Sequence, residues 1–235
     1  MHANSRLVNS NQPGIHEHLA KNVAKHALSE FQKPITAASE QAFERALSAW
    51  SEHRGALILD AGCGVGLSTR RLATMFPENF VIGVDQSADR LQRDVRWSSP
   101  PPENFFTVRA DLIDFWRLML REGIHPSRHY LLYPNPWPKK AHVGRRWHGH
   151  PVFPTIIALG GNIECRSNWK TYIDEFAAAA TQLTGKDIIT HALVVDPSAP
   201  LSPFEEKYLA SGHALWRCMI DLRSEAGEAT APPAL

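Results

Sequence analysis

Cysteine is scarce in this sequence: its 235 residues contain only Cys63, Cys165 and Cys218, an odd number at wide spacing. This set excludes a disulfide framework and offers no zinc ligand cluster, so it predicts a reducing, cytoplasmic setting. No apolar run approaches the roughly eighteen residues of a membrane helix. The N-terminus also has polar Asn, Ser and His where a signal peptide needs an apolar core. We therefore expect an intracellular protein without a membrane partner.

Strong net charge is absent as well, because 25 Lys and Arg face 24 Asp and Glu for a formal charge of +1. No global field would attract nucleic acid, so any such binding must come from a local patch. At 43% hydrophobic residues, the chain is long enough for one full core. We predict an N-terminal arm and helices over 1–54, one main domain over 55–222, and a flexible Ala, Pro and Glu-rich tail over 223–235.

The most informative stretch is the sequence LILDAGCGVG at residues 57–66. It predicts a buried parallel strand, then a tight loop, then a helix over 68–76 that Pro77 ends. Gly62, Gly64 and Gly66 allow left-handed backbone conformations and close approach to a ligand. The spacing differs from a dinucleotide fingerprint, because the third glycine comes one residue too early.

Two further apolar runs also end in an acid, which gives Asp60, Asp85 and Asp111 in succession. At this point the chain resembles the S-adenosylmethionine-dependent methyltransferases of the Rossmann-like class. The resemblance implies a doubly wound α/β fold, with a seven-stranded, mostly parallel sheet and an antiparallel last strand. It also implies S-adenosylmethionine as cofactor, with Asp60 and the glycine loop at its methionine part, Asp85 at the ribose and Asp111 at the adenine.

The helices before this domain leave two interpretations open. Residues 1–14 predict a disordered or loosely docked arm, 15–31 a helix, and Thr36 or Ser39 the N-cap of a second helix. Their Lys and His residues form either a solvated face or a contact for a large substrate. Later periodicity predicts helices over 87–97, 112–121 and 169–183, and strands over 129–133, 188–195 and 214–222.

After the strand at 129–133 the chain reads PNPWPKK, a loop stiffened by three prolines. In open α/β sheets ligands lie beyond the carboxyl ends of the strands. We therefore assign Asn135 as the catalytic residue, which positions the methyl acceptor, and Trp137 as a stacking face for a base. The alternative is a structural proline turn with a buried tryptophan.

The following residues are basic, with an interleaved aromatic, as phosphate backbone and unstacked bases require. A solubilising loop is the alternative. His148 and His150 lack a nearby carboxylate or cysteine, so we expect no metal. The predicted substrate contacts here are Lys139, Arg145 and Arg146.

The loop and its continuation resemble the P-D-P-W-x-K-x-x-H-x-x-R-R signature of the bacterial tRNA guanine-N7 methyltransferases. Stretches at 160–172, 201–205 and 212–216 resemble three further motifs of that family. The resemblance covers about residues 55–222 and implies methylation of a guanine in the tRNA variable loop. It implies tRNA as partner and substrate contacts at Lys139, Asn168 and Ser202 to Glu205; we expect a monomer or weak homodimer.

Departures from that family concern the acceptor. Asn135 and Asn168 stand where the family has Asp, and Ser202 where it has Thr. Guanine N7 carries a lone pair and no proton, so its methylation needs orientation rather than a general base. A carboxylate can accept two bonds from the guanine edge and Asn only one, a loss of about 1.5–3 kcal/mol at each site. Glu205 then becomes the remaining carboxylate for guanine, or the partner of Ser202 in a helix capping box.

Two other functions stay open. Asn-Pro-Trp also resembles a shortened N-P-P-[YFW] loop of amino-methyltransferases, which would make an adenine, cytosine or protein amide nitrogen the acceptor. A paralogue that binds S-adenosylmethionine and transfers nothing is the third interpretation.

Overall fold

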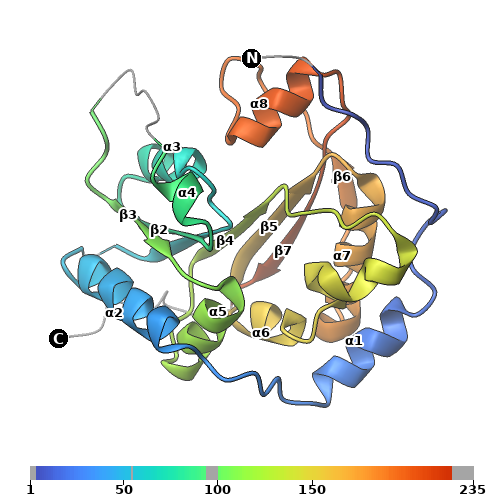
Figure 1. Ribbon diagram of the computed structural model, residues 1–235, viewed down its shortest axis with the longest axis horizontal. Coiled ribbons are helices and arrows are strands. Elements are labelled where there is room, and N and C mark those ends of the chain that lie inside the picture. Colours follow the sequence, from blue (N-terminus) through green and yellow to red (C-terminus); the bar gives the residue numbers. More distant parts are fainter. Residues whose placement is uncertain (1–3, 54, 94–99, 224–235) are drawn as a thin grey trace. The chain divides into compact units, whose positions relative to one another are not determined.

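A computed structural model describes residues 4–53, 55–93 and 100–223, and Figure 1 shows its ribbon. The chain falls into two compact units. The first comprises residues 1–33, 133–158 and 164–220, and the second comprises 34–132, 159–163 and 221–235. The predicted boundaries at residues 55 and 222 stay predictions. In the described ranges, no helix is both long and apolar enough to cross a membrane.

Among the described residues, seven strands form one sheet in the order β3-β2-β1-β4-β5-β7-β6. β1 pairs in parallel with β2 and β4, β2 pairs in parallel with β3, and β6 and β7 are antiparallel. The predicted doubly wound fold is therefore confirmed. The strands are β1 Leu57–Ala61, β2 Phe80–Asp85, β3 Phe105–Arg109, β4 Arg128–Leu132, β5 Gly161–Ser167, β6 Thr190–Ala192 and β7 Trp216–Leu222.

The second unit contains β1 to β4 and the helices α2 Ala37–Ser51, α3 Leu67–Met75, α4 Ala88–Leu91 and α5 Leu112–Arg121. Figure 1 shows α2 beside α5, and the two helices are in contact. The Thr36 side chain caps α2 by accepting from the backbone N–H of Ser39, so the first of the two predicted caps is correct. The rings of Phe43 and Phe115 join α2 to α5 at 5.2 Å. The helix predicted over 87–97 ends at Leu91, and its positions 94–97 lie outside the described residues.

The first unit contains α1 Leu19–Ala27, α6 Phe153–Ala158, α7 Lys170–Thr184, α8 Pro203–Ala210 and the 3₁₀ helices η1 Lys140–Arg145 and η2 Trp147–Gly149. α1 packs on α6, α7 and η2 and is shorter than the predicted 15–31. α7 ends at Thr184 and is capped by Gly185, whose φ of 69° lies in the left-handed region.

The N-terminal arm is docked, which corrects the prediction of a disordered or loosely docked segment. Ser10 Oγ donates to the carbonyl of Pro138 at 2.6 Å, and Asn11 Oδ1 accepts from the Lys140 N–H at 3.3 Å. Gln12 is 7% exposed, and its Nε2 donates to Glu175 at 2.5 Å. A buried amide with polar partners is a fixed anchor rather than a fraying end. Of the predicted flexible tail, residues 223–235, all but residue 223 lie outside the described residues.

Candidate functional site

The loop between β1 and α3 has the backbone that its glycines predict. Gly62, Gly64 and Gly66 have φ values of 85°, 61° and 77°, in the left-handed region that favours glycine. A Cβ at Gly66 would also make a close contact of 3.2 Å with Thr107 Cγ2. The chain can therefore turn tightly at the end of β1 and present backbone there.

Asp60 lies at this turn, and one of its two carboxylate oxygens accepts hydrogen bonds while the other has no hydrogen-bond donor among the described residues. The side chain is 1% exposed, and its Oδ2 accepts from Ser68 Oγ at 2.6 Å and from Thr69 Oγ1 at 2.8 Å. No donor in the described ranges reaches its buried Oδ1. Burial raises the pKa of Asp60 to about 6. An orphaned buried oxygen calls for a donor from a ligand, and the ammonium of the expected cofactor is such a donor. The residue thus fits S-adenosylmethionine.

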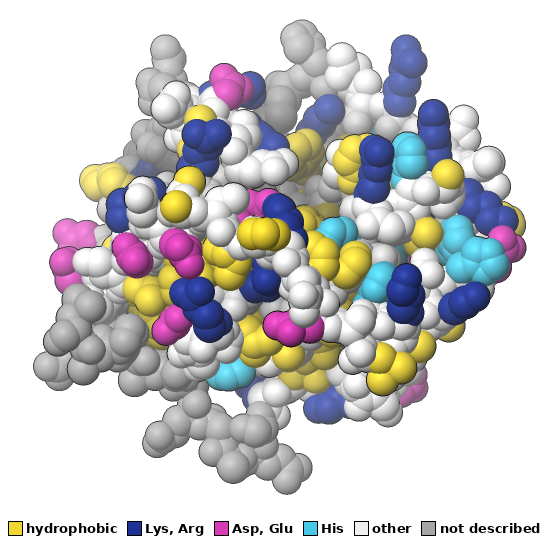
Figure 2. Space-filling model, turned by 60° about the horizontal axis from the view of Figure 1, so that its bottom comes forward, with side chains coloured by type: hydrophobic (Ala, Val, Ile, Leu, Met, Phe, Trp, Pro, Cys, Tyr) yellow, Lys and Arg dark blue, Asp and Glu magenta, His cyan; other side chains and the backbone are white. Residues whose placement is uncertain are grey.

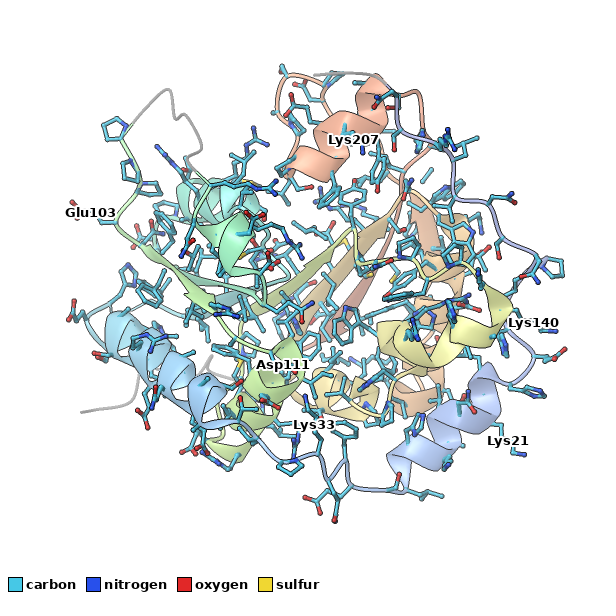
Figure 3. All side chains as sticks on the ribbon, viewed as in Figure 1. Lys21, Lys33, Glu103, Asp111, Lys140 and Lys207 are labelled. Carbon is cyan, nitrogen blue, oxygen red and sulfur yellow. The ribbon has the colours of Figure 1, made fainter. Side chains whose placement is uncertain are left out.

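Asp85 joins the end of β2 to the glycine loop. Its Oδ2 accepts from the Gly64 N–H at 3.0 Å and pairs with Arg90 at 3.2 Å, and its Oδ1 accepts from the Ser87 N–H at 2.8 Å. The structure therefore brings Asp60, the glycine loop and Asp85 together. Asp111 caps α5 by accepting from the Ile113 N–H at 2.9 Å, and Figure 3 labels it at the start of that helix. The ribose and adenine roles of Asp85 and Asp111 stay predictions.

The loop after β4, residues 133–139, is held in a strained conformation. Among the described residues other than glycine, the two with positive φ are Tyr133 at 54° and Trp137 at 43°. Each such residue costs about 1–3 kcal/mol and persists only where its surroundings fix it. The N–H of Tyr133 donates to the Arg166 carbonyl at 2.8 Å, and its hydroxyl donates to Glu205 at 2.7 Å. The strain and its supports indicate a loop built for a specific geometry.

Arg146 holds the other end of this loop from inside the unit. Its side chain is fully buried, and its Nε and Nη2 both donate to the Trp137 carbonyl at 3.2 Å. Its Nη1 donates to Glu175 at 2.5 Å and to Gln12 Oε1 at 3.1 Å. His148 Nε2 donates to the same carboxylate at 2.8 Å. These four side chains, Gln12, Arg146, His148 and Glu175, form what we call the Arg146 cluster.

Charge stabilises the Arg146 cluster. Burial alone would raise the pKa of Glu175, but the bonds from His148 and Arg146 outweigh it and lower the pKa to about 2. Burial lowers the pKa of His148. The cluster thus contains the ion pair of Arg146 with Glu175 and a further hydrogen bond from His148 to the same carboxylate. Arg146 therefore lies inside the unit, whereas the sequence predicts it on the substrate surface.

The exposed members of the predicted substrate set are Asn135, Lys139 and Arg145. Asn135 Oδ1 accepts from the Trp137 N–H at 3.4 Å. The Arg145 guanidinium lies 4.8 Å from the centroid of the Trp137 ring, a half-buried aromatic. Such stacking orients a cation and an aromatic face together. Trp137 is therefore not the fully buried tryptophan of the structural alternative.

The later predicted residues are held by internal bonds. Asn168 Nδ2 donates to His213 Nδ1 at 3.0 Å, and His213 Nε2 donates to the Ser5 carbonyl at 3.0 Å. Ser202 caps α8 by accepting from the Glu205 N–H at 3.2 Å, as the capping alternative predicts. Glu205 is fully buried and accepts from Tyr133 and also from the residues Leu201 and Arg166. Its carboxylate therefore supports the loop from within.

Supporting residues that the sequence did not reveal are Gln12, Tyr133, Arg166 and Glu175. Glu175 had a weak signal, because it stands three residues after Tyr172 and next to Phe176 on the apolar face of its helix. A charge on that face indicates a buried partner. Within the described residues, no three His, Cys, Asp or Glu side chains are grouped as a metal site would require.

Comparison with known proteins places these features in a family. Residues 54–218 match a family model described as "Putative methyltransferase". A protein of Acidovorax sp. (strain JS42), named tRNA (guanine-N(7)-)-methyltransferase, is 27% identical over 180 residues, which cover 71% of this chain and 68% of that protein. A protein of the same name from Alkaliphilus oremlandii (strain OhILAs) is 24% identical over 208 residues, which cover 83% of this chain and 94% of that protein.

Solved structures share the fold at lower identity. An antibiotic-related methyltransferase aligns with a TM-score of 0.52 and 16% identity over 80% of this chain and 96% of that one. The 16S rRNA methyltransferase KamB aligns with a TM-score of 0.51 and 13% identity, over 80% of this chain and 94% of that chain. At these identities the likeness shows the fold.

Proposed function

The chain belongs to the methyltransferase family whose model spans its residues 54–218, and from this premise we propose that it methylates guanine N7 in the tRNA variable loop. The observation that supports guanine N7 as the methyl acceptor is the strained loop at residues 133–139. This loop has the sequence that resembles the signature of the tRNA guanine-N7 methyltransferases, and it is fixed at both ends. The names of relatives that cover most of the chain support it. We place the reaction in the cytoplasm.

S-adenosylmethionine would supply a methyl group activated by its sulfonium. When the guanine N7 lone pair takes that methyl group, the cofactor would leave as a neutral thioether that keeps the electron pair of the carbon–sulfur bond. No proton is transferred, so the reaction needs no general base. What the chain must supply is orientation of the base.

We assign roles on that basis. Asn135 contacts the guanine and Trp137 stacks on a base, while Lys139 and Arg145 meet phosphates. Asn168 and Ser202 stay proposed substrate positions. Arg146 and Glu205 act as positioning residues, because buried guanidinium and carboxylate groups hold the backbone of the loop. Asp60, Asp85, Asp111 and the glycine loop bind the cofactor.

A second candidate acceptor is an exocyclic amine. The neutral amide of Asn135 favours it, because an amide oxygen can accept from an amine where guanine N7 offers no hydrogen. The Oδ1 of Asn135 already accepts from Trp137, however, at 3.4 Å. That bond is long and uses one of the two lone pairs of the amide oxygen, so the oxygen and the amide hydrogens are both available to a ligand.

The test is methyl transfer from labelled S-adenosylmethionine to unmodified bulk tRNA, followed by digestion and mass analysis of the nucleosides. We expect 7-methylguanosine. Another methylated nucleoside would establish the second candidate, and no transfer despite cofactor binding would exclude tRNA as acceptor.

Asn135→Asp should raise the rate of methyl transfer to tRNA, whereas a lower rate would favour the exocyclic amine as acceptor. Asp85→Ala is the control and should lose cofactor binding in calorimetry.

A further inference from the structure

A basic hollow opens beside α1 in the first unit. Figure 2 shows His, Lys and Arg side chains gathered on the right of that view, and Figure 3 labels Lys21 and Lys140 at the same edge. A cavity of about 400 Å³ lies there, lined by His16, His18, Lys21, Asn22, Lys140, Ala141 and Val143. We call this cavity the α1 pocket.

The polar lining of the α1 pocket consists mainly of hydrogen-bond donors. Lys21 and Lys140 bring two ammonium groups, and Asn22 adds an amide. Lys21 is exposed, so its charge is available to a ligand from solvent. Two cations and an amide on a water-accessible surface suit a hydrated anion, while Ala141 and Val143 offer little area for an apolar ligand.

His16 provides a second observation that points to a ligand. Its side chain lines the pocket and is only 7% exposed. Its Nδ1 accepts from the His18 N–H at 3.1 Å, which puts the proton of the neutral ring on Nε2. In the described part of the chain no hydrogen bond engages that Nε2. This N–H is therefore available to a ligand in the pocket, and a phosphate oxygen is an acceptor that it can bind.

Glu17 lies beside the α1 pocket and forms an ion pair with Lys140 at 3.0 Å. Both side chains are well exposed, at 59% for Glu17 and 43% for Lys140. Exposed pairs of this kind contribute only about 0–1 kcal/mol. A phosphate can therefore replace Glu17 as the partner of Lys140 at a small cost in free energy, although the nearby carboxylate still weakens anion binding.

We propose that the α1 pocket binds a backbone phosphate of RNA and so anchors the substrate at a point separate from the methylated base. This rests on the proposed function, which supplies the RNA. The pocket belongs to the same unit as the loop at 133–139, and Lys140 directly follows Lys139. Of the two interpretations open for the basic residues of α1, the pocket favours contact with a large substrate.

The test measures the affinity for tRNA and for polyuridylate between 50 and 200 mM salt, by filter binding over a titration of the protein. Polyuridylate contains no guanine, so its binding is independent of guanine methylation. Lys21→Gln and Lys140→Gln should each weaken both RNAs several-fold and reduce the salt slope on polyuridylate by about 0.7, the value for one lost phosphate contact. Glu17→Gln should strengthen binding, because it frees Lys140.

Arg45→Gln on α2 is the matched control, since it removes one charge from an exposed position of the second unit. It should leave RNA binding unchanged, and all variants should keep their cofactor affinity. The proposal is overturned if the Lys21 and Lys140 variants bind polyuridylate like the unaltered protein, or if that protein binds neither RNA. The proposal also fails if millimolar inorganic phosphate displaces RNA from the Arg45 variant while the Lys21 substitution leaves RNA affinity unchanged. Formation of 7-methylguanosine affects none of these outcomes.

Discussion

Arg145 and Arg146 are neighbours in sequence with opposite surroundings. Arg145 is exposed and stacks on Trp137, whereas Arg146 is fully buried and bonds to the Trp137 carbonyl and Glu175. Sequence motifs present both as members of one basic patch. The difference comes from Glu175, 29 residues further along the chain, whose buried carboxylate requires a cation. Pairings at that separation are invisible to local patterns.

Substitution separates these two arginines. Arg146→Gln should destabilise the protein by about 3–5 kcal/mol, because it leaves Glu175 buried without its cation. Arg145→Gln should change stability by less than about 0.5 kcal/mol and weaken tRNA binding instead. Urea unfolding and RNA titration measure the two effects. Equal stability of both variants would contradict the assignment of Arg146 to the interior.

The pKa of Asp60 predicts how cofactor binding varies with pH. Burial raises the pKa of the Asp60 carboxyl above its ordinary value, to about 6, when no ligand is bound. The ligand ammonium favours the ionised form, so binding should lower that pKa. Affinity should therefore be full well above pH 6 and fall as pH drops through 6, about tenfold between pH 7 and pH 5.

Calorimetry at pH 7 and pH 5 checks this dependence on Asp60. Asp60→Asn keeps an oxygen for Ser68 and Thr69 but cannot ionise, so its affinity should be low and independent of pH over this range. A pH dependence in the variant equal to that of the unaltered protein would assign the titration to another group.

Among the elements, the N-terminal arm matters most for the loop at 133–139. Gln12 reaches Arg146 and Glu175 across 134 and 163 residues of sequence, and Ser10 bonds to Pro138. Gln12→Ala should lower kcat on tRNA and expose the arm to proteolysis, while the Kd for cofactor stays unchanged. Asn11→Ala, which removes one exposed bond, should have little effect. Unchanged kcat in the Gln12 variant would contradict a positioning role for the arm.

The elements also show what local patterns can predict. The apolar strands that carry Asp60 and Asp85, the glycine loop, and the helices α5 and α7 followed from periodicity and capping. The docked arm did not, because its polar residues resemble a solvated segment until their distant partners are known. The internal position of Glu205 also depends on distant residues, Tyr133 and Arg166.

For the protein as a whole, the central claim is transfer of methyl to one atom, guanine N7. The direct measurement compares two transcripts of one tRNA, made with guanosine or with 7-deazaguanosine, in which carbon replaces N7. We predict labelled methyl incorporation into the first and none into the second, although the second should still compete for binding. Equal incorporation into both transcripts would contradict the claim and assign the methyl group to another atom.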